Sequence, residues 1–524
     1  MKRIFFILFL ILIFVRSGFS AKLPKHWHES GGFACDIKAG LDGKVIKVTN
    51  LKSSGAGSLR DALSQSGKRL IVFKVGGVID LEGKNLRISK GDVTIAGQTA
   101  PSPGITLIKG DVGFNASNIV MSHITSRLGT KVGGAYDAMG IYADNVVLDH
   151  VAASWSADEC ISIKNCKNVT LYKTMVTEAM SVSIHPEGEH SKGSLIQSVN
   201  NTSFIGTLYA HNALRNPRLQ RNAQVALING VIYNWFPGAD DEGAKRFNYV
   251  IHMHRAQMAI VGVTGLQGPQ SVGDTLVAGH KTSSGKAYMK DNLIMDPTGK
   301  PLTEYNKKNI TALDEPPLWP AGVEVIPTKE NFYEVLRTVG PRPGDREAIT
   351  ARVIKTVADG TGEIVHNEEQ VGGYPKYKET RHTVNVPDGF AARRAWLDSL
   401  EDAMAVDTKL DLSRLYGIVG TKEDDKYASS ETKVTRKTIN TDNQLTHNFY
   451  VKNNLHVNLT IPAANTVSLK IVDFFGRSVV QTSKKHLPAG SHKLAIDVNQ
   501  ISRGLYICQC TVGNTVINRM FRKF

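Results

Sequence analysis

Short apolar runs separated by small polar residues fill residues 44–300 of this 524-residue chain. The runs include KVIKVTN, GITLIKG, NIVMSHI, NVVLDHV, NVTLYKT and QVALING. They are rich in β-branched residues and bounded by Gly, Asn, Asp and Ser, as β-strands are. Helical periodicity is nearly absent, apart from GSLRDAL, where Ser58 can cap a short helix. The pattern predicts an all-β domain of many short strands.

Asparagine recurs at the start of several runs, at Asn118, Asn145, Asn168 and Asn248. The first two intervals are 27 and 23 residues, and the third has room for several more turns. A strand-and-turn unit of about 20–30 residues without intervening helices is typical of a β-helix solenoid. A β-sandwich is the alternative, but it needs tight Asn-Gly or Asp-Gly hairpins, which are scarce here. We therefore expect a parallel β-helix.

The pattern changes after residue 300, where prolines are followed by three helical segments: ENFYEVLRTVG (330–340), DREAITARVIKTVADG (345–360) and GFAARRAWLDSLEDAMAV (389–406). We expect this part to wrap or cap the solenoid, because open solenoid ends need covering. A polar, charged stretch then predicts a linker, and renewed strand alternation predicts a small C-terminal β-sandwich. The expected organisation is a signal peptide (1–20), a β-helix (21–300), a trailing segment (301–420), a linker (421–454) and the sandwich (455–524).

The N-terminus has a basic start, a short apolar core and small residues near Ser20, which predicts a cleaved export signal. An uncleaved membrane anchor is the alternative, but Arg16 interrupts an already short apolar run. After cleavage we expect no membrane span, and therefore a protein that is secreted or held at the cell surface. The five cysteines are odd in number and scattered, which indicates buried thiols rather than a disulfide framework.

The net charge of +15 raises the possibility of nucleic-acid binding. The excess is concentrated in residues 455–524, where nine Lys and Arg face only Asp473 and Asp497. Bulk charge therefore says little about the ligand of the main domain, and we expect no nucleic-acid partner.

Seven segments resemble polysaccharide lyase family 1, the pectate lyases, in the form found in exported Bacteroidetes-type proteins. They follow the family's order: VTNLKSSGAGSLRDAL (48–63), IAGQTAPSPGITLIKG (95–110), SRLG (126–129), YDAMGI (136–141), NVVLDHVAASWSADE (145–159), HNALRNPR (211–218) and NGVIYNW (229–235). The tail, with VDFFGRSVV, LPAGSHKLAIDV and SRGLYICQ, resembles the C-terminal sorting domain of the type IX secretion system. The resemblance implies a right-handed parallel β-helix and a monomeric lyase that acts on polygalacturonate and uses Ca²⁺.

Three acidic residues are the candidate calcium ligands: Asp137, Asp158 and Glu159. Asp137 and Asp158 precede Asn145 and Asn168 by eight and ten residues, so they can stack on successive turns. Stacked carboxylates repel each other unless a cation joins them. On spacing alone both could be ordinary turn residues, and the resemblance favours the metal site. Many family members carry a further Asp where this chain has Ser162, so Glu159 is expected to substitute or the substrate to supply more of the ligands.

The stretch LRNPRLQRN (214–222) crowds three arginines, which predicts an anionic ligand. The resemblance makes Arg215 the catalytic residue, as proton acceptor, as a guide for hydroxide, or as the group that stabilises the carbanion. We expect Arg218 to bind a uronate carboxylate through its planar fork. Family members often have an arginine where Gln220 stands. Arg221 is a weak substitute, because a shift by one residue reverses the face of a strand.

A family lysine is also missing near Ser181, and Lys192 or His190 could supply the positive group. His185 and His190 are otherwise expected to be surface residues of a polar loop. Asp149 and His150 are adjacent on a strand, so we expect them to point to opposite faces and to play structural roles.

The leading hypothesis is an endo-acting, calcium-dependent pectate lyase. A pectin lyase that acts on methyl-esterified chains is one alternative, although the acids at 137, 158 and 159 argue against it. A non-catalytic β-helical protein that binds acidic glycans is the other.

Overall fold

The computed structural model describes residues 22–235, 249–280, 285–428, 444–447, 450–451, 453–461, 463–473, 477–513 and 515–523. The predicted signal peptide and Asn248 lie outside these ranges. The chain divides into two compact units, one up to Thr380 together with Met404–Ser429, the other from Arg381 to Ala403 together with Ser430–Phe524. Across the described ranges, no helix combines the length and the apolar composition needed to cross a membrane.

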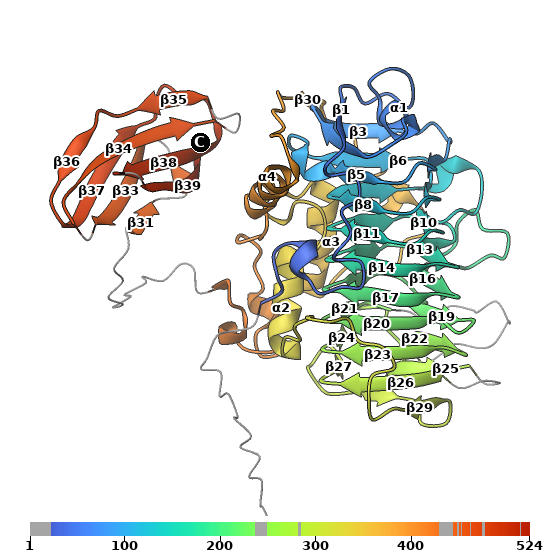
Figure 1. Ribbon diagram of the computed structural model, residues 1–524. Coiled ribbons are helices and arrows are strands. Elements are labelled where there is room, and N and C mark those ends of the chain that lie inside the picture. The colour runs from blue at the N-terminus through green and yellow to red at the C-terminus, as the bar shows by residue number, and fades with distance from the viewer. Residues whose placement is uncertain are drawn as a thin grey trace, which may run out of the picture. The chain divides into compact units, whose positions relative to one another are not determined.

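The first unit is a parallel β-helix, as the sequence predicts, and its strands stack along one axis in three sheets (Figure 1). Sheet 1 contains β1 (Lys44–Val48), β2 (Arg69–Phe73), β5 (Val93–Ala96), β8 (Ile119–Ser122), β11 (Val146–Asp149), β14 (Lys167–Tyr172), β17 (Asn200–Ile205), β20 (Gln224–Ile228), β23 (Gln257–Val261), β26 (Gly285–Lys290) and β29 (Ile310–Ala312). Sheet 2 contains β3 (Val75–Asp80), β6 (Ile105–Ile108), β9 (Ile124–Arg127), β12 (Ala152–Ser154), β15 (Met175–Thr177), β18 (Leu208–Ala210), β21 (Val231–Tyr233), β24 (Thr264–Leu266) and β27 (Leu293–Met295). Sheet 3 contains β4 (Leu86–Ile88), β7 (Val112–Phe114), β10 (Met139–Ile141), β13 (Glu159–Lys164), β16 (Lys192–Gln197), β19 (Arg218–Gln220), β22 (Tyr249–His254), β25 (Thr275–Gly279) and β28 (Thr303–Tyr305).

An asparagine ladder fixes the turn between sheet 3 and sheet 1. The side-chain amides of Asn145, Asn168 and Asn201 each donate to the amide oxygen one turn earlier, over 3.0–3.1 Å. These asparagines and Asn118 have φ between 49° and 63°, a left-handed conformation that asparagine tolerates better than most residues. The ladder confirms the turn positions expected at Asn118, Asn145 and Asn168, and it adds Asn201.

The interior of the coil is apolar throughout. Inward-facing Val, Ile, Leu, Met and Phe from all three sheets form one continuous buried cluster. Helix α1 (Leu59–Ser64) starts at Ser58, whose hydroxyl accepts from the Asp61 amide over 3.2 Å, as the sequence predicts. Its Leu59, Ala62 and Leu63 join the same cluster and cover the N-terminal part of the core against β1 and β4.

The trailing segment wraps the side of the solenoid. Helices α2 (Thr328–Thr338) and α3 (Ala348–Asp359) form where the sequence predicts them. Phe332 and Leu336 of α2 and Val353 of α3 pack in a second buried cluster with outward residues of sheet 2, among them Tyr233. These helices therefore lie against the outer face of sheet 2 (Figure 1).

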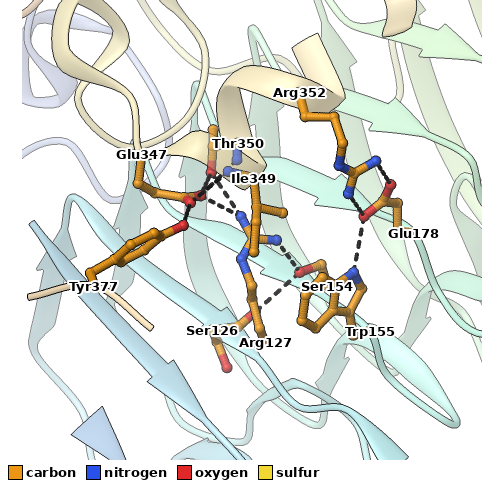
Figure 2. Close-up of polar contacts among 10 residues, drawn as sticks. All are labelled: Ser126, Arg127, Ser154, Trp155, Glu178, Glu347, Ile349, Thr350, Arg352 and Tyr377. Carbon is orange, nitrogen blue, oxygen red and sulfur yellow. Dashed lines mark hydrogen bonds and ion pairs between the residues drawn. The ribbon is translucent and has the colours of Figure 1, made fainter. Parts of the chain in front are cut away.

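Buried ion pairs fasten α3 to sheet 2 (Figure 2). Glu347 caps the helix by accepting from the Ile349 and Thr350 amides over 2.8 and 2.7 Å, and it pairs with the buried Arg127 of β9. Arg352 binds the Glu178 carboxylate with two hydrogen bonds of 2.7 and 2.8 Å. Glu178 opens the loop from 178 to 191 between β15 and β16, so α3 also holds the base of that loop.

The second unit contains α4 (Phe390–Asp402), at the predicted place, and a small β-sandwich. One sheet has the order β31 (Gln444–His447), β33 (Asn454–Ile461), β37 (Gly490–Asp497). The other is built from β32 (Tyr450–Val451), β39 (Thr515–Lys523), β38 (Gly504–Val512), β34 (Asn465–Val472), β35 (Ser478–Gln481) and β36 (Lys485–Leu487). Pairing is antiparallel except between β32 and β39. The sandwich has its own core, to which Cys508 and Cys510 contribute as buried free thiols. Strands β31 and β32 fall within the stretch expected to be a linker.

Candidate functional site on sheet 3

The candidate residues gather near the N-terminal ends of four neighbouring strands of sheet 3, which lie in the order β10, β13, β16, β19. Glu159 of β13 pairs in register with Lys192 of β16, and Leu195 of β16 pairs with Arg218 of β19. Asp137 precedes β10, and Arg215 precedes β19. Neighbouring strands are about 4.8 Å apart, so the parallel stacking brings together residues that are nearly 80 positions apart in the sequence.

Asp137, Asp158 and Glu159 form an acid cluster. Each offers a carboxylate oxygen within 4.8 Å of the others. The Glu159 amide donates to the Asp137 carboxylate over 3.1 Å. Burial, followed by the negative charges of Glu159 and Asp158, raises the pKa of Asp137 well above its usual range. Ser162 lies three residues after Glu159 in the same strand, β13, and its hydroxyl oxygen is 3.5 Å from Glu159 Oε2. Ser162 therefore adds an oxygen atom to the acid cluster without adding a charge.

Two histidines of the loop from 178 to 191 face the acid cluster. His190 is 2% exposed and its Nε2 lies 3.0 Å from Asp158 Oδ1, while His185 Nε2 lies 3.9 Å from the same oxygen. The two rings stack at 3.5 Å. Burial acts to raise the pKa of Asp158, but the hydrogen bond and charge of His190 outweigh it and lower this pKa to about 2. The expectation that His190 is a surface residue is therefore wrong, because the loop folds back onto sheet 3.

Arg215 is buried and pairs with the Glu159 carboxylate. Its φ of 59° turns the backbone just before β19. Asn212 and Asn216 stabilise this turn with an amide–amide hydrogen bond of 3.1 Å. Gly193 lets the turn approach β16, because a Cβ there would lie 2.7 Å from the Arg215 carbonyl oxygen. The Arg215 guanidinium thus joins the acid cluster to the basic side of the site.

Lys192 and Arg218 complete the basic side, and both are buried. Arg218 pairs in register with His252 of β22. Burial, followed by the positive charges of Arg218 and His280, lowers the pKa of His252 to about 2. Arg221 is exposed in the turn between β19 and β20, beyond the strand that carries Arg218. The structure therefore gathers the acid cluster, Lys192, Arg215 and Arg218 at one place, and it sets Arg221 apart.

Comparison with known proteins decides the family. The probable pectate lyase C of Neosartorya fischeri is 30% identical over 364 residues, which cover 65% of this chain and 79% of that protein. The chain belongs to the pectate lyase family.

The same comparisons give further relatives of this pectate lyase. The probable pectate lyase C of Aspergillus fumigatus is 31% identical over 327 residues, covering 61% of this chain and 70% of the relative. The solved structure of the thermostable pectate lyase PL 47 is 13% identical, covers 60% of this chain and 97% of that one, and has a TM-score of 0.44. Residues 451–522 match the family of secretion system C-terminal sorting domains, in agreement with the resemblance of the tail.

Sequence reasoning missed or misplaced several residues of this pectate lyase. His190 is named from the sequence only as a possible positive group, and Asn212 and Asn216 lie in HNALRNPR without a role of their own. Loop closure and backbone turns bring these three residues into the site. Asp149 and His150 were expected on opposite faces, but His150 Nδ1 lies 2.7 Å from Asp149 Oδ1 and both are buried. The expectation was wrong because φ of His150 is 49°, so the chain turns there and strand alternation ends.

Proposed function

We propose that this pectate lyase is calcium-dependent and cleaves polygalacturonate by β-elimination to unsaturated oligogalacturonides. The observation that supports it is the acid cluster next to Arg215, Lys192 and Arg218. A β-elimination needs a site that neutralises the uronate carboxylate and accepts the α-proton together.

The acid cluster suits a hard cation. Its donors are oxygen atoms within 4.8 Å of one another, and burial together with the charges of Glu159 and Asp158 raises the pKa of Asp137. Ca²⁺ accepts flexible oxygen coordination, whereas Mg²⁺ demands near-ideal octahedral geometry. Bound by Asp137, Asp158 and Glu159, calcium would supply a positive charge that neutralises the uronate carboxylate.

Arg215 is the proposed catalytic residue. In the structure its partner is the Glu159 carboxylate, to which the guanidinium donates a hydrogen bond. This contact supports the role of stabilising the carbanion by hydrogen bonds more than the role of free base. Glu159 would hold the cation together with Asp137 and Asp158, and the Arg215 guanidinium would then donate to the substrate instead of to Glu159.

Three further cations are proposed to hold the polysaccharide. Arg218 binds a uronate carboxylate through two parallel N–H donors. Lys192, in register with Glu159, supplies the positive charge that the missing family lysine would give. Arg221, exposed beyond β19, is an outlying contact for the chain.

The activity is tested by following unsaturated uronide absorbance on polygalacturonate and on methyl-esterified pectin, with Ca²⁺ and with a chelator. We expect product on polygalacturonate that disappears with the chelator. Arg215→Lys should lower kcat by about a hundredfold or more, as loss of an oriented transition-state donor does, and leave binding largely intact. The control is Arg255→Lys, an exposed residue after β22. Activity that survives the chelator would indicate a pectin lyase, and no product on either substrate would favour a glycan-binding protein.

The sorting domain supports a proposal about location. We infer that the signal peptide exports the chain from the cytoplasm and that the tail hands it to the type IX secretion machinery. The enzyme then acts outside the cell or on its surface, as a monomer.

A further inference from the structure

A second group of side chains lies on sheet 3, on the side of the acid cluster away from Arg218. Strand pairing places one residue of each strand in a continuous line across the sheet: Arg87, Gly113, Gly140, Ser162, Leu195 and Arg218. In-register positions of parallel strands point to the same face. Arg87 and Arg218 therefore share one face of sheet 3, with Ser162 of β13 in the line between them and Glu159 at the start of the same strand.

Two glycines in this line leave room for larger neighbours to lie across the strands. A Cβ on Gly113 would come within 2.8 Å of Arg87 Cδ, and one on Gly140 within 2.3 Å of the Tyr142 hydroxyl oxygen. The Arg87 side chain therefore lies over β7, and the Tyr142 ring lies over β10. Any larger residue at either glycine would displace them.

Both side chains are available to a ligand. Tyr142 is 41% exposed, an unusual state for a large aromatic residue. The Arg87 side chain is also 41% exposed, and its ion pair with the buried Asp111 fixes its position. A guanidinium carries five N–H donors, so this one pair leaves donors for a second anion.

Tyr142 is also close to the acid cluster. Burial, followed by the charge of Asp137, raises the pKa of Tyr142 to about 12, and the positive charge of Arg87 opposes this rise. The phenol thus lies between the acid cluster and Arg87, on the same face as both.

We propose that Arg87 and Tyr142 form an outlying binding site for an acidic sugar of the chain that is being cleaved. The inference rests on the proposed function. The Tyr142 ring offers an apolar face to the pyranose ring, and Arg87 binds the uronate carboxylate with its planar fork. Arg87 is on β4 and Arg218 is on β19, and these strands are five strand intervals, or about 24 Å, apart in sheet 3. Only a long oligosaccharide can therefore reach both residues.

The site predicts a dependence on substrate length. Arg87→Ala and Tyr142→Ala should each raise KM for polygalacturonate by about three- to tenfold, the loss expected for one solvent-exposed hydrogen bond or one aromatic contact. They should leave kcat and the kinetics on trigalacturonate unchanged. Arg87→Lys keeps the ion pair with Asp111 but loses the fork, and it should show part of the effect. Lys84→Ala is the control, because Lys84 is an exposed cation that pairs with Glu82 at the same end of the domain.

Unchanged KM for the polymer in both alanine variants, or an equal rise for trigalacturonate, would overturn the proposal. If the wild type cleaves neither substrate, the proposed function fails. The outlying site is then measured by calorimetric titration of a long galacturonate oligomer into the Arg215→Ala variant, with and without Tyr142→Ala. Equal affinities in that pair would refute it.

Discussion

At the residue scale, Glu159 belongs to two groups at once. It is part of the acid cluster, and its carboxylate is the partner of Arg215. A side chain in this position makes the state of the arginine depend on what else the carboxylate binds. The proposed cation site and the proposed catalytic role of Arg215 are therefore expected to be coupled through the Glu159 carboxylate.

Glu159→Gln tests this coupling. The amide keeps the size of the side chain and an oxygen for Arg215, but it removes one negative charge from the cluster. We expect the Kd for Ca²⁺ to rise by at least about tenfold, because ligand charge sets the affinity of such sites. Calorimetric titration of Ca²⁺ measures this, with Glu187→Gln as the control on the exposed part of the neighbouring loop. An unchanged Kd would show that Ca²⁺ binds elsewhere.

Side-chain direction at single residues was predictable only where the backbone stays extended. The alternation rule fails at Asp149 and His150, and Arg215 also lies at a positive φ. His190 was assigned to the surface because a polar loop carries it, and only the folded loop shows that it reaches Asp158. Residue types and approximate places can thus be predicted from the sequence, whereas partners across turns cannot.

At the scale of elements, the repeat of the chain was predictable because each turn must place a strand and a tight corner in the same order. Asn118, Asn145 and Asn168 marked these corners, and the ladder of amides explains why asparagine stands there. Asn201 was missed because a long loop stretches that turn to 33 residues. The helices after residue 300 followed from their periodicity, but their position against sheet 2 depends on packing that no local pattern reveals.

Glu347 caps α3 and pairs with Arg127 of sheet 2. Because this carboxylate must be ionised to form the pair, we expect the stability of the β-helix to depend on pH. Burial acts to raise the pKa of Glu347, but Arg127, Thr350 and Tyr377 outweigh it and lower this pKa to about 2 from 4.5. The stabilisation is therefore complete above pH 4.5 and is lost as the pH falls toward 2. Glu347→Gln should destabilise the β-helix by about 3–5 kcal/mol at neutral pH, because it leaves Arg127 as an uncompensated buried charge.

Denaturant unfolding from pH 7 to 2 checks the role of Glu347. The wild type should lose more stability than Glu347→Gln over the acidic half of this range. Glu369→Gln is the matched control in the same segment, because Glu369 is 66% exposed and its pair with Lys131 is a surface ion pair. Such pairs contribute about 0–1 kcal/mol. Parallel pH profiles for the wild type and Glu347→Gln would contradict the assignment.

At the scale of the whole molecule, the unit that carries the candidate site and the C-terminal tail each have a hydrophobic core of their own. The site residues belong to the first unit, whose apolar clusters draw on no residue after 444. The tail packs its own cluster from residues 451–521 and coincides with the sorting-domain match. Catalysis and export are therefore expected to be separable by mutation.

Removal of residues 444–524 tests this separation. We expect kcat/KM on polygalacturonate to stay within about twofold of the full-length value, since the deleted segment packs its own core and supplies none of the described site residues. We also expect the truncated protein to accumulate in the cell envelope instead of the medium. The full-length Arg215→Lys variant is the complementary control, because it should be exported normally while having little activity. Immunoblots and activity assays of medium and envelope fractions distinguish the two defects. Truncated enzyme in the medium at the full-length level would refute the sorting role, because export would then be independent of the segment that matches a sorting domain.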